Sequence, residues 1–153
     1  MYEEHNGSAF GDEESYFGLS ASKALSWHKQ FQQSGKISDR WIRDSFITRM
    51  ELLWNSSNIG FGLPDANGKM TSYYLAAYLL AGEKTGWPKP FDSNRRTLVK
   101  DTLNFLQRSE NGGFATWYIV QNGKIVEVVP NGNIETTSLA VCVNIKPQDY
   151  SAF

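Results

Sequence analysis

Two segments of this chain end in the same way, and that repetition constrains the fold more than any other feature. They are LLWNSSNIGFGLP, residues 52–64, and FLQRSENGGFATW, residues 105–117. In each, an apolar helical pattern gives way to a short polar stretch, a glycine and a phenylalanine. Glycine lets the backbone turn sharply where a helix ends. A repeat of this length is typical of helical arrays in which neighbouring units bury a shared core.

The repeat extends over three units of unequal length. Phe10, Phe61 and Phe114 lie 51 and 53 residues apart. Each is followed by a stretch rich in hydroxyl residues that can begin a helix, at residues 20, 71 and 136. In the first two units this start comes ten residues after the phenylalanine. The third unit is longer, so it should contain an insertion.

Two longer segments have the pattern of helices with one buried face. The first spans residues 38–54, where Ser38 is the expected N-cap. The second spans residues 93–108. Apolar residues at helical spacing predict which face of each is buried. They are Ile42, Phe46, Met50 and Leu53 in the first segment, and Leu98, Val99, Leu103 and Leu106 in the second.

Two further segments, residues 71–81 and 136–145, should form helices that are buried on most sides. The first is apolar around its whole circumference, which is typical of a helix in the core. Gly82 is the expected stop. Another helix should begin at Ser20. The chain therefore predicts an arrangement of half-exposed helices that alternate with buried ones.

The insertion in the third unit should form a β-hairpin near residues 116–129. Two β-rich runs, 116–121 and 124–129, flank Asn122 and Gly123. This dipeptide suits a tight hairpin turn because both positions adopt positive φ. The hairpin could be a loop that only decorates the surface. Alternatively, it could be a functional flap or an edge that binds a partner.

Length and composition favour one globular domain covering residues 1–153. The helical patterns make it mainly α-helical, with a polar segment at 1–19 and about two and a half repeats in 20–153. The formal net charge of −1 does not favour nucleic acid as a partner. No apolar run is long enough to span a membrane. The first residues lack a secretory signal, and a single cysteine cannot form an internal disulfide. We therefore expect a cytoplasmic protein.

The turn residues resemble the repeat of protein prenyltransferase β subunits and of squalene and terpene cyclases. In that repeat a helix ends with glutamine, a glycine-rich turn and an aromatic residue, and an inner helix then opens at threonine or serine. The middle unit has Gly60 and Phe61 but no glutamine. The resemblance covers residues 36–143 and implies a partial α/α toroid. The matching residues of the third unit are Gln107, Gly112, Gly113, Phe114, Thr136, Thr137 and Ser138.

The sequence lacks the catalytic motifs that the resemblance would imply. It has no Asp-x-Asp-Asp run of the kind that protonates substrate in cyclases. It lacks the Asp-x-Cys pair and later histidine that bind zinc in prenyltransferases, because Val141 and Ala140 precede Cys142, and His5 and His28 lie upstream. The thioester motif of related toroid domains is also missing. We therefore expect no catalytic residue, no metal and no cofactor.

Aromatic residues around the inner-helix starts are the remaining candidates for a binding site. In the related enzymes such residues line a central cavity and stabilise carbocations. In a partial toroid they would instead form core. Glu135 precedes a helix, where a negative charge is favoured in any case. The candidates for substrate binding are Tyr73, Tyr74, Tyr78, Trp117 and Glu135.

Two functions fit these observations. The first is a non-catalytic module that binds another protein chain, further repeats or a second copy of itself through the apolar face of residues 136–145. An uncovered apolar helix face favours association. The alternative is a fragment or subunit of an enzyme that handles an isoprenoid substrate, with its catalytic groups on another segment.

Overall fold

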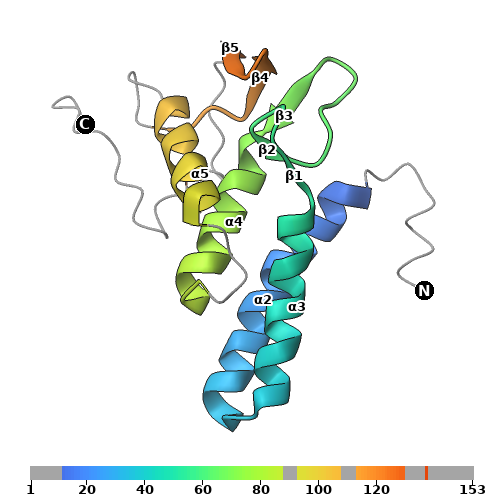
Figure 1. The fold of residues 1–153 in the computed structure, drawn as a ribbon, viewed down its shortest axis with the longest axis vertical. Coiled ribbons are helices and arrows are strands. Elements are labelled where there is room, and N and C mark those ends of the chain that lie inside the picture. Colours follow the sequence, from blue (N-terminus) through green and yellow to red (C-terminus); the bar gives the residue numbers. More distant parts are fainter. Residues whose placement is uncertain (1–11, 88–92, 108–112, 130–136, 138–153) are drawn as a thin grey trace, which may run out of the picture.

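The computed structural model describes residues 12–87, 93–107, 113–129 and residue 137, and these form a mainly helical fold, as predicted (Figure 1). Helices α2 and α3 form an antiparallel hairpin, α4 lies beside α2, and α5 lies beside α4. Two small antiparallel sheets lie at one end of the helices (Figure 1). The helices are α2 (Asp12–Ser34), α3 (Ile37–Leu52), α4 (Ser72–Thr85) and α5 (Ser93–Leu106). The strands are β1 (Trp54–Asn55), β2 (Gly60–Phe61), β3 (Lys69–Thr71), β4 (Trp117–Gln121) and β5 (Lys124–Val128).

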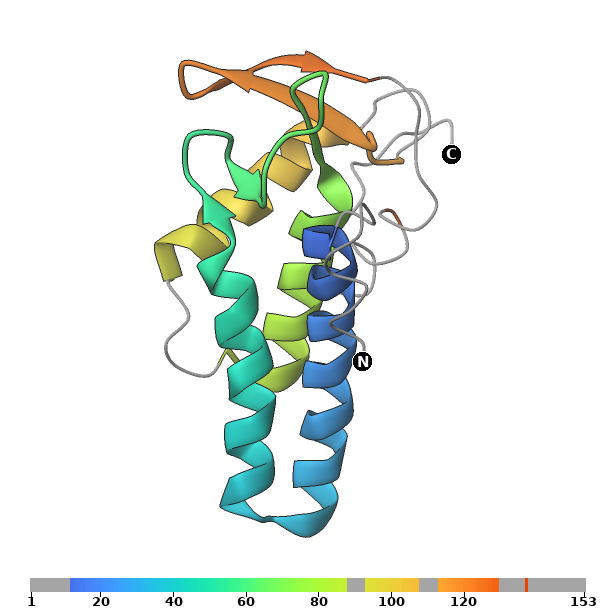
Figure 2. The same cartoon turned by 90° about the vertical axis from the view of Figure 1, so that its right-hand side faces the viewer.

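The α2–α3 hairpin extends beyond the other helices (Figure 2), and both of its predicted helix starts were wrong. Helix α2 begins at Asp12 and not at Ser20, consistent with the preference of carboxylates for the first helical turn. Helix α3 begins after Lys36, which makes no side-chain cap, so Ser38 is not the N-cap. Ser34 supports the turn instead, because its Oγ accepts from the Lys36 N–H at 3.0 Å.

The predicted buried face of α3 was largely wrong. Ile42 is 37% exposed and Phe46 is half-buried, whereas Met50 is buried as expected. Two charged residues face inward because α2 supplies polar partners for them, which a count of apolar residues cannot detect. The buried residues of α3 are Asp39, Arg43, Ile47 and Met50.

Helix α4 is buried on most sides, as predicted. The side chain of Thr71 caps its first turn by accepting from the Tyr73 N–H at 3.2 Å. Gly82 does not stop the helix, which continues to Thr85 and ends at Gly86 with φ +80°. Gly82 instead lets the Trp87 ring approach the helix, since an added Cβ would lie 2.4 Å from that ring.

The two repeated endings make the same backbone contacts, and we call each set of contacts a joint. The first joint consists of Leu53, Trp54, Phe61 and Gly62, and the second of Leu106, Gln107, Phe114 and Ala115. The Gly62 N–H donates to the Leu53 carbonyl at 2.7 Å, and the Ala115 N–H donates to the Leu106 carbonyl at 2.9 Å. Both members of the second pair follow those of the first by 53 residues. Trp54 pairs with Phe61 in the first joint, as Gln107 pairs with Phe114 in the second. Trp54 is therefore in a strand, and the predicted helix 38–54 ends at Leu52.

The predicted hairpin is confirmed, and it is part of a larger sheet. Strands β4 and β5 join through Asn122 and Gly123, which have φ of 53° and 76°. Strand β4 also pairs with β3, which leads directly into α4. Tyr118 on β4 is completely buried, and its hydroxyl donates to the Ile59 carbonyl at 2.7 Å. The hairpin is thus more than surface decoration, because it fixes the second joint to the first.

The apolar core lies between α4, α5 and the two joints. Ser72 at the start of α4 connects the units, since its Oγ donates to the Ala115 carbonyl at 2.6 Å. Phe114 donates its N–H to Thr137 Oγ1 at 3.0 Å, which places Thr137 at the second joint. The rest of the predicted helix at 136–145, including Cys142, lies outside the described residues. The largest fully buried side chains are Tyr78, Tyr118, Phe61, Phe114, Ile47, Met50, Met70, Leu75, Leu79, Leu103 and Leu106.

Candidate functional site

An open groove of about 420 Å³ runs between α2 and α4. Its lining is mostly apolar, with serine and lysine on the α2 side. The residues from α4 recur every three or four positions, so they form one ridge of that helix. Those from α2 form two neighbouring rows with a step of four residues, Ala21, Leu25 and Lys29 in one and Ser22 and Ser26 in the other. The lining residues are Ala21, Ser22, Leu25, Ser26 and Lys29 from α2, with Tyr73, Ala77 and Leu80 from α4.

Small side chains make this groove. Ala21 and Ala77 are almost completely buried, at 7% and 3% exposed, and they keep the space between the helices shallow. Leu25, Tyr73 and Leu80 are half-buried around them. Tyr73 and Leu80 are the apolar residues of α4 that are not fully buried. Helix α4, which is apolar on nearly all sides, therefore has apolar side chains at the groove that are only partly covered.

The lining offers apolar contacts, serine hydroxyls and one positive charge. Lys29 is the one charged lining residue, and the described lining contains no carboxylate, histidine or thiol that could act with it. A groove with an apolar ridge on α4 and with Ala21 and Leu25 on α2 has a shape that accepts the apolar face of another helix. The volume also lies in the range of roughly 300–1,000 Å³ found for small-molecule pockets.

The structure separates the residues that the sequence proposed for substrate binding. Tyr73 lines the groove. Tyr74 and Tyr78 lie in the core, at 5% and 0% exposed. Trp117 is half-buried on β4, where it pairs with Thr71, and Glu135 lies outside the described residues. Among the residues proposed for the joints, Gly60, Phe61, Gln107 and Phe114 are buried in them, Gly113 is half-buried, and Gly112 is outside the described part.

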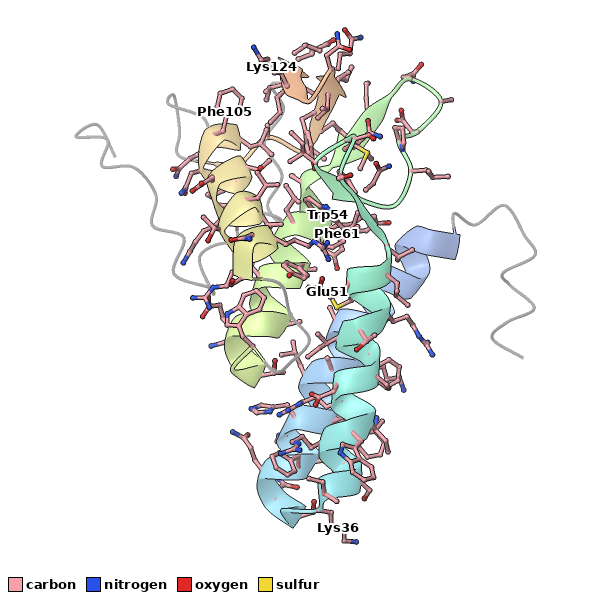
Figure 3. All side chains as sticks on the ribbon, in the orientation of Figure 1. Lys36, Glu51, Trp54, Phe61, Phe105 and Lys124 are labelled. Atoms are coloured by element: carbon pink, nitrogen blue, oxygen red, sulfur yellow. The ribbon has the colours of Figure 1, made fainter. Side chains whose placement is uncertain are left out.

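A charged group in the core was missed by sequence reasoning. Glu51 on α3 accepts a hydrogen bond from the Tyr78 hydroxyl at 2.5 Å and forms an ion pair with Arg95 of α5. The Arg95 guanidinium also lies over the Trp54 ring, 5.2 Å from its centroid. Figure 3 shows Glu51 close to Trp54 and Phe61 of the first joint. One carboxylate thus connects three helices and a joint, which is a structural role. In the sequence, the signal for this role of Glu51 is weak: a carboxylate near the end of a predicted helix, three residues before Trp54.

A second polar cluster holds the α2–α3 hairpin together. Arg43 is 5% exposed, and its Nη1 donates to His28 Nδ1 at 2.9 Å. Its Nε donates to Asp44 at 2.8 Å, and its guanidinium lies over Phe31. Burial and the neighbouring Arg43 charge lower the pKa of His28, against the opposite effect of Asp44. Because the Arg43 guanidinium can only donate, His28 Nδ1 is the acceptor of this hydrogen bond.

The described residues contain no group of three or more histidine, cysteine, aspartate or glutamate side chains that could bind a metal. In the same part of the chain, no helix combines the length and apolar character needed to cross a membrane. Comparison with known proteins gives no match to any family model, curated protein or solved structure.

Proposed function

We propose that this chain is a non-catalytic helical-repeat module that binds a helix of another protein in the groove between α2 and α4. The observation that supports this most is the half-buried apolar edge of α4, Tyr73 and Leu80, beside Leu25 of α2. Apolar surface gains about 25 cal/mol for each Å² that is removed from water. A partner helix that covers both ridges would gain that free energy, and Lys29 at the groove would favour an acidic residue on the partner.

We further propose that the repeated joints belong to a partial α/α toroid. Two joints with equivalent hydrogen bonds, each placed after a half-exposed helix, support that arrangement. In a toroid the helices that begin after a joint line the centre, which would place the α2–α4 groove on the central face. Further repeats, from this polypeptide or from another chain, would then be natural partners for it.

An isoprenoid-binding role is the competing function. The volume of about 420 Å³ and the lining by Tyr73 and Leu80 favour it. Tyr74 and Tyr78 do not, because both lie in the core. An isoprenoid would bind in the same groove, so one set of variants tests both functions.

The experiment uses Leu80→Gln, with Leu98→Gln on α5 as the matched control, since Leu98 is 42% exposed and lies outside the groove. Affinity purification with the native chain, followed by mass spectrometry, identifies the bound protein. Binding of that purified protein should weaken at least tenfold with Leu80→Gln and remain unchanged with Leu98→Gln. Equal binding by both variants would contradict the proposal. Fluorescence titration with farnesol tests the alternative, and saturable binding that Leu80→Gln abolishes would replace the protein-binding function.

A further inference from the structure

The outward face of α3 carries an uncharged stripe. It consists of Ile37, Trp41, Ser45, Thr48 and Leu52, which are spaced by four, four, three and four residues and so share one side of the helix. This side lies opposite the buried residues Asp39, Arg43, Ile47 and Met50. Ile37, Trp41 and Leu52 are 48%, 62% and 79% exposed. A large exposed tryptophan between two exposed aliphatic residues is typical of an interface and unusual for a solvated helix.

A shallow hollow of about 350 Å³ lies at the Leu52 end of this stripe. It is formed where α3 passes into the first joint, and Leu63, 74% exposed, adds to its apolar rim. The large protruding side chains Ile37 and Trp41 are at the other end of the stripe. The face therefore carries a projection at one end and a hollow at the other. Its lining residues are Leu52, Leu53, Trp54, Asn55, Ser56, Gly62 and Leu63.

The two ends of the hairpin also differ in charge. Every carboxylate between residues 20 and 52 is engaged within the fold, Asp39 by Ser34, Asp44 by Arg43 and Glu51 by Tyr78 and Arg95. Near the tip, where Lys36 lies (Figure 3), Lys29, Lys36 and Arg40 are exposed. The tip therefore carries positive charge.

Acidic residues begin the hairpin at its other end. Helix α2 starts there, at the level of the Leu52 end of α3, because the two helices are antiparallel (Figure 2). Its first three residues are Asp12, Glu13 and Glu14. The positive tip of one hairpin and the acidic start of α2 in another attract each other when the two hairpins lie antiparallel.

We propose that two copies of this chain associate through the outward faces of α3, antiparallel and related by a two-fold axis near Ser45. Ile37 and Trp41 of one copy then meet the hollow beside Leu52 of the other. The small Ser45 lets the helices approach closely at the axis. A two-fold interface needs a self-complementary face, and this stripe is one. A 16-residue helix is about 24 Å long, so the interface is small and the dimer weak.

Disulfide formation tests the position of the axis. Ser45→Cys should form a covalent dimer under mild oxidation, because two cysteines beside a two-fold axis can reach the required Cα separation of roughly 4.4–6.8 Å. The control is Thr97→Cys, an exposed position on α5. Both variants are made with Cys142→Ala. Equal rates of cross-linking for the two variants would contradict the interface.

Sedimentation equilibrium tests the association itself. The native chain should show a dimer at concentrations near 100 µM in low salt. Its dissociation constant should rise at least tenfold with Trp41→Ser and also rise with added salt. Leu98→Ser should leave it unchanged, and circular dichroism should show both variants folded. A folded monomer at all concentrations would overturn the proposal. If Leu80→Gln raises the dissociation constant of the dimer and Trp41→Ser does not, self-association uses the α2–α4 groove and not the outward face of α3.

Discussion

Gly60 gives the most direct test of the first joint at the residue scale. A Cβ at this position would lie 2.6 Å from the Tyr118 hydroxyl oxygen and 2.7 Å from Met70 Cε. We expect Gly60→Ala to lower the free energy of unfolding by about 1–3 kcal/mol, as overpacking of a filled core does. Urea denaturation measures this loss.

Removing the Tyr118 hydroxyl, which the new Cβ at position 60 would meet, separates the packing effect of Gly60→Ala from its effect on the backbone. Tyr118→Phe loses the hydrogen bond to Ile59 and should cost about 1 kcal/mol alone. In the double variant the cost should be smaller than the sum of the two single costs, because the hydroxyl that meets the new Cβ is gone. Strict additivity would show that the Gly60 Cβ does not meet that hydroxyl.

His28 should make the stability of the hairpin depend on pH. Burial and Arg43 lower the pKa of His28 below its usual value of 6.5, so the folded chain binds fewer protons than the unfolded chain in this range. Stability should therefore be fully present above pH 6.5 and fall as the pH decreases through that value. Urea denaturation at pH 7.5 and 5.5 measures the difference. His28→Gln should reduce it, and an unchanged pH dependence would exclude His28 as the cause.

At the scale of elements, the joints and the hairpin were predictable and the inner face of α3 was not. Each joint is marked by a glycine and a phenylalanine that lie close together in the sequence, and the hairpin is marked by Asn122 and Gly123. Both features can therefore be predicted from a short stretch of sequence. The burial of Arg43 depends on His28 fifteen residues away, and β3 pairs with β4 across more than forty residues. Such partners are set by tertiary packing. The groove was missed for the same reason, since it needs α2 and α4 side by side.

Among the charged residues of the helices, we expect substitution of Glu51 to lower the free energy of unfolding the most. Its side chain is 9% exposed, and it satisfies both Tyr78 and Arg95. Glu51→Gln removes the Glu51–Arg95 ion pair, whose two side chains are mostly buried. We expect a loss of about 3 kcal/mol in the free energy of unfolding, measured by denaturation. The control is Glu83→Gln, whose 3.8 Å pair with Arg96 is more exposed and should cost less than about 1 kcal/mol. Equal losses would contradict a special role for Glu51.

At the scale of the whole molecule, the helices differ in how they join the main core. The apolar cluster contains most of α4, the buried side of α5 and both joints. Among the side chains that the structure describes in α2 and α3, it contains only Ala21 and Met50. The far part of the α2–α3 hairpin is held instead by the polar contacts of Arg43 and Asp39 (Figure 2). Its buried Ala24 and Ile47 lie outside that cluster.

This division predicts two levels of protection in native-state hydrogen exchange at low protein concentration, where self-association is negligible. Amides of α4 should open only with global unfolding, whereas amides of residues 26–45 should exchange through a local opening of lower free energy, because few apolar contacts must break. Arg43→Leu should leave the protection of α4 largely unchanged and alter that of residues 26–45, since it replaces the polar contacts of the hairpin alone. Glu51→Gln should lower protection in α4. Uniform protection of both regions would show that the hairpin and the core unfold as one cooperative unit.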